Sequence, residues 1–202
     1  MVTQVKYKNR IDVDTIEDYE IEFFHREDVQ KALSRNDVNE FIDILSDYSA
    51  EFGLEVYSNI IKIMFEMGIN IFDYINCIPS WCFYNTDICQ IKIGDNITSI
   101  RDWTFLETKE LEKVIIPGNI KVIGFQSFEQ SGVVDVVLEE GVEEIYGFAF
   151  QDSDIMEITL PKSLWFIDKT IFNGTLINTI NVYEGSYAEK RCKELDWKYN
   201  II

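Results

Sequence analysis

Residues 111–128 read LEKVIIPGNIKVIGFQSF and combine a strand, a turn and the start of a return segment. In Val114-Ile115-Ile116 the outer side chains point to one side of an extended chain and the middle one to the other. Pro117-Gly118 then breaks the strand, because both residues favour turns. Ile120, Ile123 and Phe128 supply apolar side chains for the return. The stretch therefore predicts one coil of a larger repeating structure.

The same pattern recurs through the second half of the chain with a period of 22 or 23 residues. Five columns of apolar residues keep one register across five units. They are Phe83, Phe105, Phe128, Phe150 and Phe172; Ile78, Ile100, Ile123, Ile145 and Ile167; Ile91, Val114, Val136, Ile158 and Ile180; Ile93, Ile116, Leu138, Leu160 and Val182; and Ile75, Ile97, Ile120, Val142 and Leu164. Because one coil of this size cannot enclose a core, successive coils must stack. The columns predict a parallel-stacked solenoid of about five coils.

These repeats resemble the BspA-type leucine-rich repeat. Residues 111–128 look like one such unit, and Ile145–Phe150 (IYGFAF) is similar to its glycine-x-x-alanine-phenylalanine signature. The resemblance covers roughly residues 75–183 and continues into Gly185–Lys190, which is similar to the helix that often closes such arrays. It implies an α+β leucine-rich-repeat solenoid that serves as a protein-binding scaffold and has no shared catalytic residue. The sequence departs from the pattern at Trp81, at Cys82, and at Asp168 in place of the signature glycine.

The chain divides into three predicted segments. Residues 1–76 form a mainly helical N-terminal cap, which a solenoid needs because its first coil would otherwise expose apolar core and strand edge. Residues 77–183 form the solenoid, and residues 184–202 form a C-terminal cap with a short helix. No proline- or glycine-rich linker separates the first two segments, so we expect one rigid body.

Several elements of the N-terminal segment can be predicted individually. Asp37 and Glu40 form a capping box that begins a helix, and Gly53 ends it. A second helix runs from about residue 55 to 68, and a shorter one is expected near residues 26–33. Residues 19–23 alternate apolar and acidic side chains and predict a half-buried strand that pairs with residues 2–7. The apolar stripes of the two longer helices are Phe41, Leu45, Tyr48 and Phe52, and Val56, Ile60, Ile63 and Met67.

The formal net charge of −18 narrows the classes of partner. Such an acidic surface repels phosphate backbones, which argues against direct nucleic-acid binding. It attracts basic protein surfaces, although it also serves plain solubility. No apolar run is long enough for a membrane helix and no signal peptide is visible, so we expect no membrane partner and a cytoplasmic location. Oligomeric state is left open.

Conventional catalytic and metal sites are missing from the sequence. His25 is the sole histidine, which excludes two-histidine metal sites and argues against conventional triads and acid–base pairs, and there is no phosphate-binding loop. Cys77, Cys82 and Cys89 allow a zinc interpretation, but their spacing is not that of a known finger. Cys82 also shares a column with small core residues, which favours packing. We predict no catalytic residue, no metal and no cofactor, and hence not an enzyme.

Two surfaces are candidates for partner binding. The first is the outward side of the strands, where Ile115 and Val137 would lie side by side within a rim of charged and polar residues, an arrangement typical of a binding hot spot. The alternative is that β-branched residues merely favour exposed strands. The rim comprises Lys113, Asp135, Glu157 and Thr159. The second surface is an acidic edge that comprises Glu139, Glu140, Glu143 and Glu144. These residues could also be simply solvated. A calcium site fits less well, because the sequence lacks the spacing of acidic residues and the turn glycine of a calcium loop.

The sequence therefore predicts a non-enzymatic protein-binding module that presents a leucine-rich-repeat strand face. The alternative is an acidic inhibitor of the phage anti-defence type, which would block the nucleic-acid-binding groove of a host protein. High salt would weaken binding through the acidic surface more than binding through an apolar one.

Overall fold

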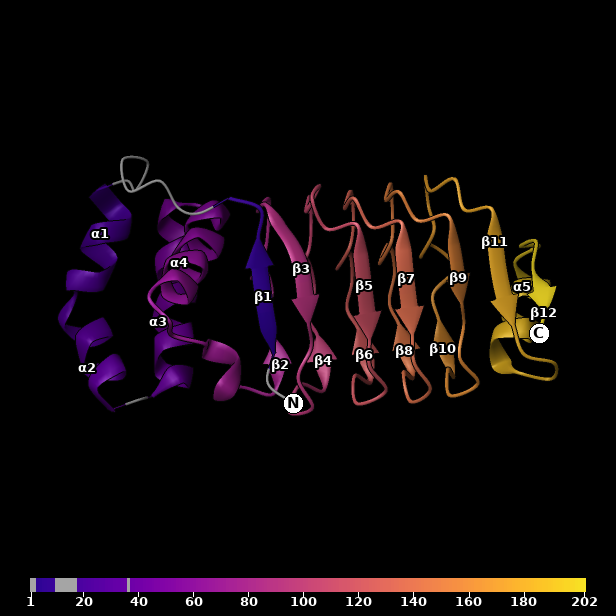
Figure 1. Ribbon diagram of the computed structural model, residues 1–202, viewed down its shortest axis with the longest axis horizontal. Helices are drawn as coiled ribbons and strands as arrows, with labels where there is room; N and C mark the ends of the chain where they lie inside the picture. The colour runs from indigo at the N-terminus through magenta and orange to yellow at the C-terminus, as the bar shows by residue number, and fades with distance from the viewer. Residues whose placement is uncertain (1–2, 10–17, 36) are drawn as a thin grey trace.

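The computed structural model describes residues 3–9, 18–35 and 37–202, and it shows helices at one end of a row of stacked coils (Figure 1). The coils follow one another from the helical end to the C-terminus. Two parallel sheets run along the row. One has the order β2-β4-β6-β8-β10 and the other β5-β7-β9-β11-β12. The architecture is the predicted α+β solenoid.

Each coil contributes one short strand to the first sheet, and each coil after the first contributes a longer strand to the second. The short strands are β2 (Cys77–Ile78), β4 (Ser99–Ile100), β6 (Val122–Ile123), β8 (Glu144–Ile145) and β10 (Phe166–Ile167). The longer ones are β5 (Lys113–Ile116), β7 (Asp135–Leu138), β9 (Glu157–Thr159) and β11 (Thr179–Val182), followed by the terminal β12 (Asn200–Ile201). Equivalent residues pair in register, as Val114 does with Val136 and Ile123 with Ile145. The repeat period therefore sets the register of both sheets.

The core is a ladder of phenylalanine rings between the two sheets. Phe83, Phe105, Phe128, Phe150 and Phe172 stack nearly parallel, with successive ring centroids 5.0, 4.8, 5.4 and 6.2 Å apart. The isoleucine, valine and leucine columns beside them are buried, apart from Ile75 in the first unit, which is half-buried. This confirms the predicted core columns.

Within residues 18–35 and 37–76, four α-helices and a short 3-10 helix precede the first coil. They are α1 (Asp18–His25), α2 (Glu27–Arg35), α3 (Val38–Phe52), α4 (Leu54–Glu66) and η2 (Ile71–Asp73). The Asp37 side chain caps α3 by accepting a hydrogen bond of 3.1 Å from the amide of Glu40, and Gly53 ends that helix with φ +109°. These elements confirm the predicted Asp37 and Gly53 caps and the predicted helices near 26–33 and 55–68. The return half of the capping box is absent, because the amide of Asp37 donates to the Ala32 carbonyl at 2.9 Å.

The predicted apolar stripes are correct only in part, because Phe52 and Met67 are exposed and Ile63 is only half-buried. In α4, Ile61 and Met64 are buried instead.

The predicted strand over residues 19–23 is wrong, because these residues belong to α1. Glu20 and Phe23, three residues apart, are buried, whereas Ile21 is 45% exposed. Phe23 packs edge-on against Phe41 of α3, with ring centroids 5.6 Å apart. A five-residue segment with both apolar and acidic side chains fits the repeat of a strand and that of a helix equally well. Packing on α3 favours the helix.

The strand expected over residues 2–7 is present as β1 (Gln4–Tyr7), and Val2 lies outside the described residues. Its partner differs from the predicted one. It pairs antiparallel with β3 (Ile88–Lys92), the longer strand of the first coil. The register shifts between Lys6 and Tyr7, which places a bulge at Cys89. The strand β1 therefore covers the edge that β3 would otherwise expose.

The C-terminal end contains the predicted helix, α5 (Tyr187–Glu194). The Ser186 side chain caps it by accepting a 3.1 Å hydrogen bond from the amide of Glu189. Beyond it, Trp197 packs against Phe172, with ring centroids 5.2 Å apart. An aromatic side chain thus closes the phenylalanine ladder at this end. Among the described residues, no helix is both long and apolar enough to cross a membrane.

Candidate functional site

The strand face is formed by the outward side chains of β5, β7, β9 and β11. Buried and exposed residues alternate along β5 and β7, as the sequence predicts. Ile115 and Val137 are register partners in adjacent strands and are 46% and 39% exposed. The structure therefore brings the two predicted apolar residues side by side on an open surface.

Charged and polar side chains surround this apolar pair. Lys113 forms an ion pair with Asp135, its register partner in β7. Asp135 in turn lies opposite Glu157 of β9, so two like charges are adjacent there. Thr159 is half-buried beside Val137. The predicted rim of Lys113, Asp135, Glu157 and Thr159 is thus contiguous with the apolar pair.

Sequence reasoning missed the contribution of β1 to this face. In β1, Gln4 pairs with Lys92 and Lys6 with Gln90, and all four side chains are exposed. The alternation of polar Gln4 and Lys6 with Val5 and Tyr7 is a signal for a strand with one exposed side, but it does not reveal the partner. The face therefore extends over β3 to β1, and its basic residues gather at this end.

A cleft of about 830 Å³ lies where β1 and β3 meet β5. Within the described part of the chain, no backbone hydrogen bond joins β3 to β5, and the two strands belong to different sheets. Ile91 and Ile115 line the cleft together with Lys6, Lys92 and Lys113. The strand face is consequently hollow beside Ile115.

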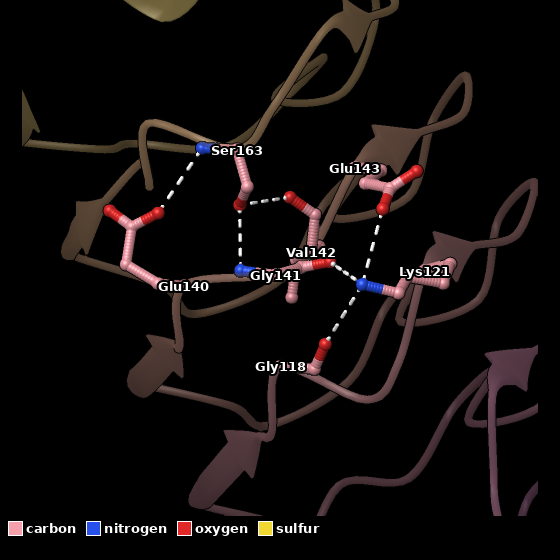
Figure 2. Close-up of polar contacts among 7 residues, drawn as sticks. All are labelled: Gly118, Lys121, Glu140, Gly141, Val142, Glu143 and Ser163. Carbon is pink, nitrogen blue, oxygen red and sulfur yellow. Dashed lines mark hydrogen bonds and ion pairs between the residues drawn. The ribbon is translucent and has the colours of Figure 1, made fainter.

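The acidic edge lies at the turns that follow the strands, and its carboxylates make contacts within the chain (Figure 2). The Glu140 carboxylate accepts hydrogen bonds from the backbone amides of Lys162 at 2.9 Å and Ser163 at 3.2 Å, in the next turn. Glu143 forms a 3.1 Å ion pair with Lys121 of the preceding coil. These two carboxylates therefore hold successive coils together.

Two glycines allow the turns at this edge to stack closely. Gly141 has φ +116°, and a Cβ there would lie 2.3 Å from the carbonyl oxygen of Gly118. A Cβ on Gly118 would lie 1.9 Å from the carbonyl oxygen of Glu140. The Lys121 ammonium spans the turns by donating to the carbonyls of Gly118 at 3.3 Å and Gly141 at 2.9 Å (Figure 2). Only glycine permits this backbone approach.

The other two acidic residues are less engaged. Glu144 accepts a 2.8 Å hydrogen bond from the Tyr146 hydroxyl, which raises the pKa of that tyrosine. Glu139 is exposed, and its carboxylate lies 3.4 Å from the Gly118 amide. Within the described part of the chain, the only contact of these two carboxylates with a neighbouring turn is therefore the long one between Glu139 and the Gly118 amide.

The cysteines have separate environments. Cys82 is fully buried in the column that also holds Thr104, and burial raises the pKa of its thiol well above the usual value. Burial likewise raises the pKa of Cys192, to about 11. Cys77 and Cys89 are half-buried. Across residues 3–9, 18–35 and 37–202, no group of three histidine, cysteine or acidic residues is placed to hold a metal ion.

Stacked parallel coils with an exposed strand face define a leucine-rich-repeat solenoid. The chain belongs to the BspA type leucine-rich repeat region family, whose sequence model matches residues 57–188 in six copies. Repeats of this kind are generally protein-interaction modules. The match begins within α4, and its six copies are one more than the five units that contain the ladder phenylalanines. No curated protein and no solved structure matches the chain.

Proposed function

We propose that this protein is a non-enzymatic binding module whose strand face recognises another protein. The observation that supports the proposal is the exposed pair Ile115 and Val137, in register on adjacent strands and next to charged side chains. In many protein interfaces a few residues near the centre provide most of the binding energy, while the polar rim around them excludes water. The cleft beside Ile115 would receive a protruding side chain of the partner.

The test replaces both apolar residues with aspartate. Ile115→Asp combined with Val137→Asp would place unpaired carboxylates in a desolvated contact, which is costly. We expect partner binding to weaken at least about thirtyfold, which corresponds to roughly 2 kcal/mol. The partner is captured by cross-linking in the native cell, identified by mass spectrometry and titrated against the purified protein by calorimetry.

A matched control makes the result interpretable. Trp165 and Leu176 are 56% and 88% exposed and lie outside the strand face, so Trp165→Asp with Leu176→Asp adds the same charge elsewhere. Circular dichroism must show that both double variants are folded, because unfolding would mimic lost binding. Equal affinities of the two double variants for the partner would refute the strand-face proposal.

The net charge of −18 supports a second candidate, an acidic inhibitor that occupies the nucleic-acid-binding groove of a basic protein. Reversing all four glutamates of the acidic edge would also remove the turn contacts of Glu140 and Glu143. Glu139→Lys with Glu144→Lys is the cleaner variant. Under this alternative it would weaken binding and flatten its dependence on salt, whereas the strand-face double variant would bind nearly normally.

A further inference from the structure

A second ladder of aromatic rings runs along the solenoid outside the phenylalanine core, and it stops at Trp81. The rings of Trp81 and Trp103 are stacked with centroids 4.5 Å apart and 6° between their planes, and both are half-buried. Phe125 continues the row edge-on, with its centroid 5.9 Å from that of Trp103. The row follows the solenoid axis, so the face of Trp81 opposite Trp103 turns toward the helices.

The two ladders end differently on the helical side. The inner ladder is closed by Phe72 of η2, whose ring centroid lies 6.0 Å from that of Phe83. For Trp81, the only other ring contact among the described residues is with Tyr84 of the same coil, edge-on at 5.9 Å. The position of the next ring in the outer ladder is therefore not filled by an aromatic residue of the described chain.

A cleft of about 540 Å³ occupies this position between α3, the start of α4 and the first coils. Its volume lies within the range of small-molecule sites in proteins. The cleft shares no lining residue with the strand-face cleft, and it lies on the side of β2 and β4. Its walls are formed from the helices by Ile42, Asp43, Ser46 and Tyr57 and from the solenoid by Trp81 and Arg101, among others.

The polar groups of the cleft indicate the chemistry of an occupant. Arg101 is exposed, and its guanidinium makes no ion pair or side-chain hydrogen bond within residues 3–9, 18–35 and 37–202. Burial raises the pKa of the Tyr57 hydroxyl well above its usual value, while weaker influences from Ser46 and the positive charge of Arg101 lower it. The Ser46 hydroxyl donates to the Ile42 carbonyl at 2.8 Å and can still accept a hydrogen bond.

We propose that the cleft binds a small planar aromatic compound that carries one anionic group. The aromatic ring would stack on the open face of Trp81 as the next ring of the outer ladder. The anion, a carboxylate, sulfonate or phosphate diester, would pair with Arg101, whose planar guanidinium suits such groups. Asp43 on the opposite wall disfavours compounds with a second negative charge. This ligand site is independent of the protein-binding function proposed for the strand face.

The experiment uses two fluorescent probes, anilinonaphthalene sulfonate and phenylnaphthylamine, which is the same compound without its sulfonate. We expect the full-length protein to bind the sulfonate at one saturable site, about tenfold more tightly than the neutral probe. Arg101→Gln should remove this preference and leave affinity for the neutral probe unchanged. Trp81→Ala should weaken binding of both probes. Arg101 is exposed, so its variant keeps the fold even if Trp81→Ala does not.

Two controls locate the bound probe. The Ile115→Asp, Val137→Asp double variant should bind both probes like the parent, which separates this site from the strand face. Cys77 lines this cleft and Cys89 lines the strand-face cleft, and both are half-buried. Bound sulfonate probe should slow alkylation of Cys77 by iodoacetamide, read by mass spectrometry, but not that of Cys89. Absence of saturable binding, an unchanged preference in Arg101→Gln, or equal protection of both thiols would overturn the proposal.

Discussion

Replacing Phe128 with alanine would remove a central ring of the phenylalanine ladder. Phe128 is fully buried and stacks on Phe105 at 4.8 Å and on Phe150 at 5.4 Å. Burial of a phenylalanine side chain contributes about 1.5–3 kcal/mol, and each ring pair adds about 0.5–1.5 kcal/mol. We therefore expect a loss of about 3–5 kcal/mol, the usual range for this substitution in a core.

The same substitution at Phe172 is the matched comparison. Phe172 is slightly exposed, and its parallel neighbour Phe150 is farther away, with centroids 6.2 Å apart. Its other neighbour, Trp197, is tilted by 55° and belongs to the C-terminal segment, which can relax toward the space left by the ring. We expect Phe172→Ala to cost about 1–2 kcal/mol less than Phe128→Ala, because a site that collapses costs less.

Urea unfolding followed by circular dichroism and by tryptophan fluorescence measures both losses. Two probes are needed because stacked repeats can unfold in parts, and coincident transitions show that a single free energy is defined. A larger loss at Phe172 than at Phe128, or equal losses within about 0.5 kcal/mol, would contradict the ladder as the main source of core stability.

Two other changes test backbone geometry and a charged pair. Gly141→Ala should lower the free energy of unfolding, measured in urea, by about 1 kcal/mol or more beyond the effect of Gly53→Ala. Both glycines have φ near +110°, but only at Gly141 would a Cβ lie against backbone. Equal losses would contradict the close turn. The hydrogen bond from Arg26 lowers the pKa of Asp28 from 3.8 to about 2, so its stabilising contribution is present above pH 4 and is lost as pH falls toward 2. The stability difference between the parent and Asp28→Asn should therefore shrink over that interval, and a difference independent of pH would refute the pairing.

The solenoid could be predicted from sequence because its structure is local and repeated. Each column, such as Val114 and Val136, carries the same information several times, and stacking then fixes the register. The exposure of Ile115 follows from strand alternation alone. The Asp37 cap was also predictable, because a capping box depends on residues only three positions apart.

The pairing of β1 with β3 was not predictable in the same way. Gln4 pairs with Lys92, which is 88 positions away in the sequence, and no repeated pattern predicts that contact. Residues 19–23 were predicted as a strand because a segment of five residues does not distinguish the two-residue repeat of a strand from the 3.6-residue repeat of a helix. Contact with a distant residue, Phe41, determines which side chains are buried. The cleft at Trp81 escaped prediction for a similar reason, since its helical wall comes from α3.

The contacts of the acidic edge change what the net charge implies about a partner. A formal charge of −18 suggests a surface ready for a basic protein, but Glu140 caps the backbone of the next turn and Glu143 neutralises Lys121. A charged partner would have to compete with these contacts, and a carboxylate already bonded to two amides has less to gain from an additional cation. By contrast, Ile115 and Val137 gain from being covered, because their side chains are exposed to water in the free protein. These effects together support the proposal that the strand face recognises the partner, and under that proposal the acidic surface would change only the rate and the salt dependence of binding.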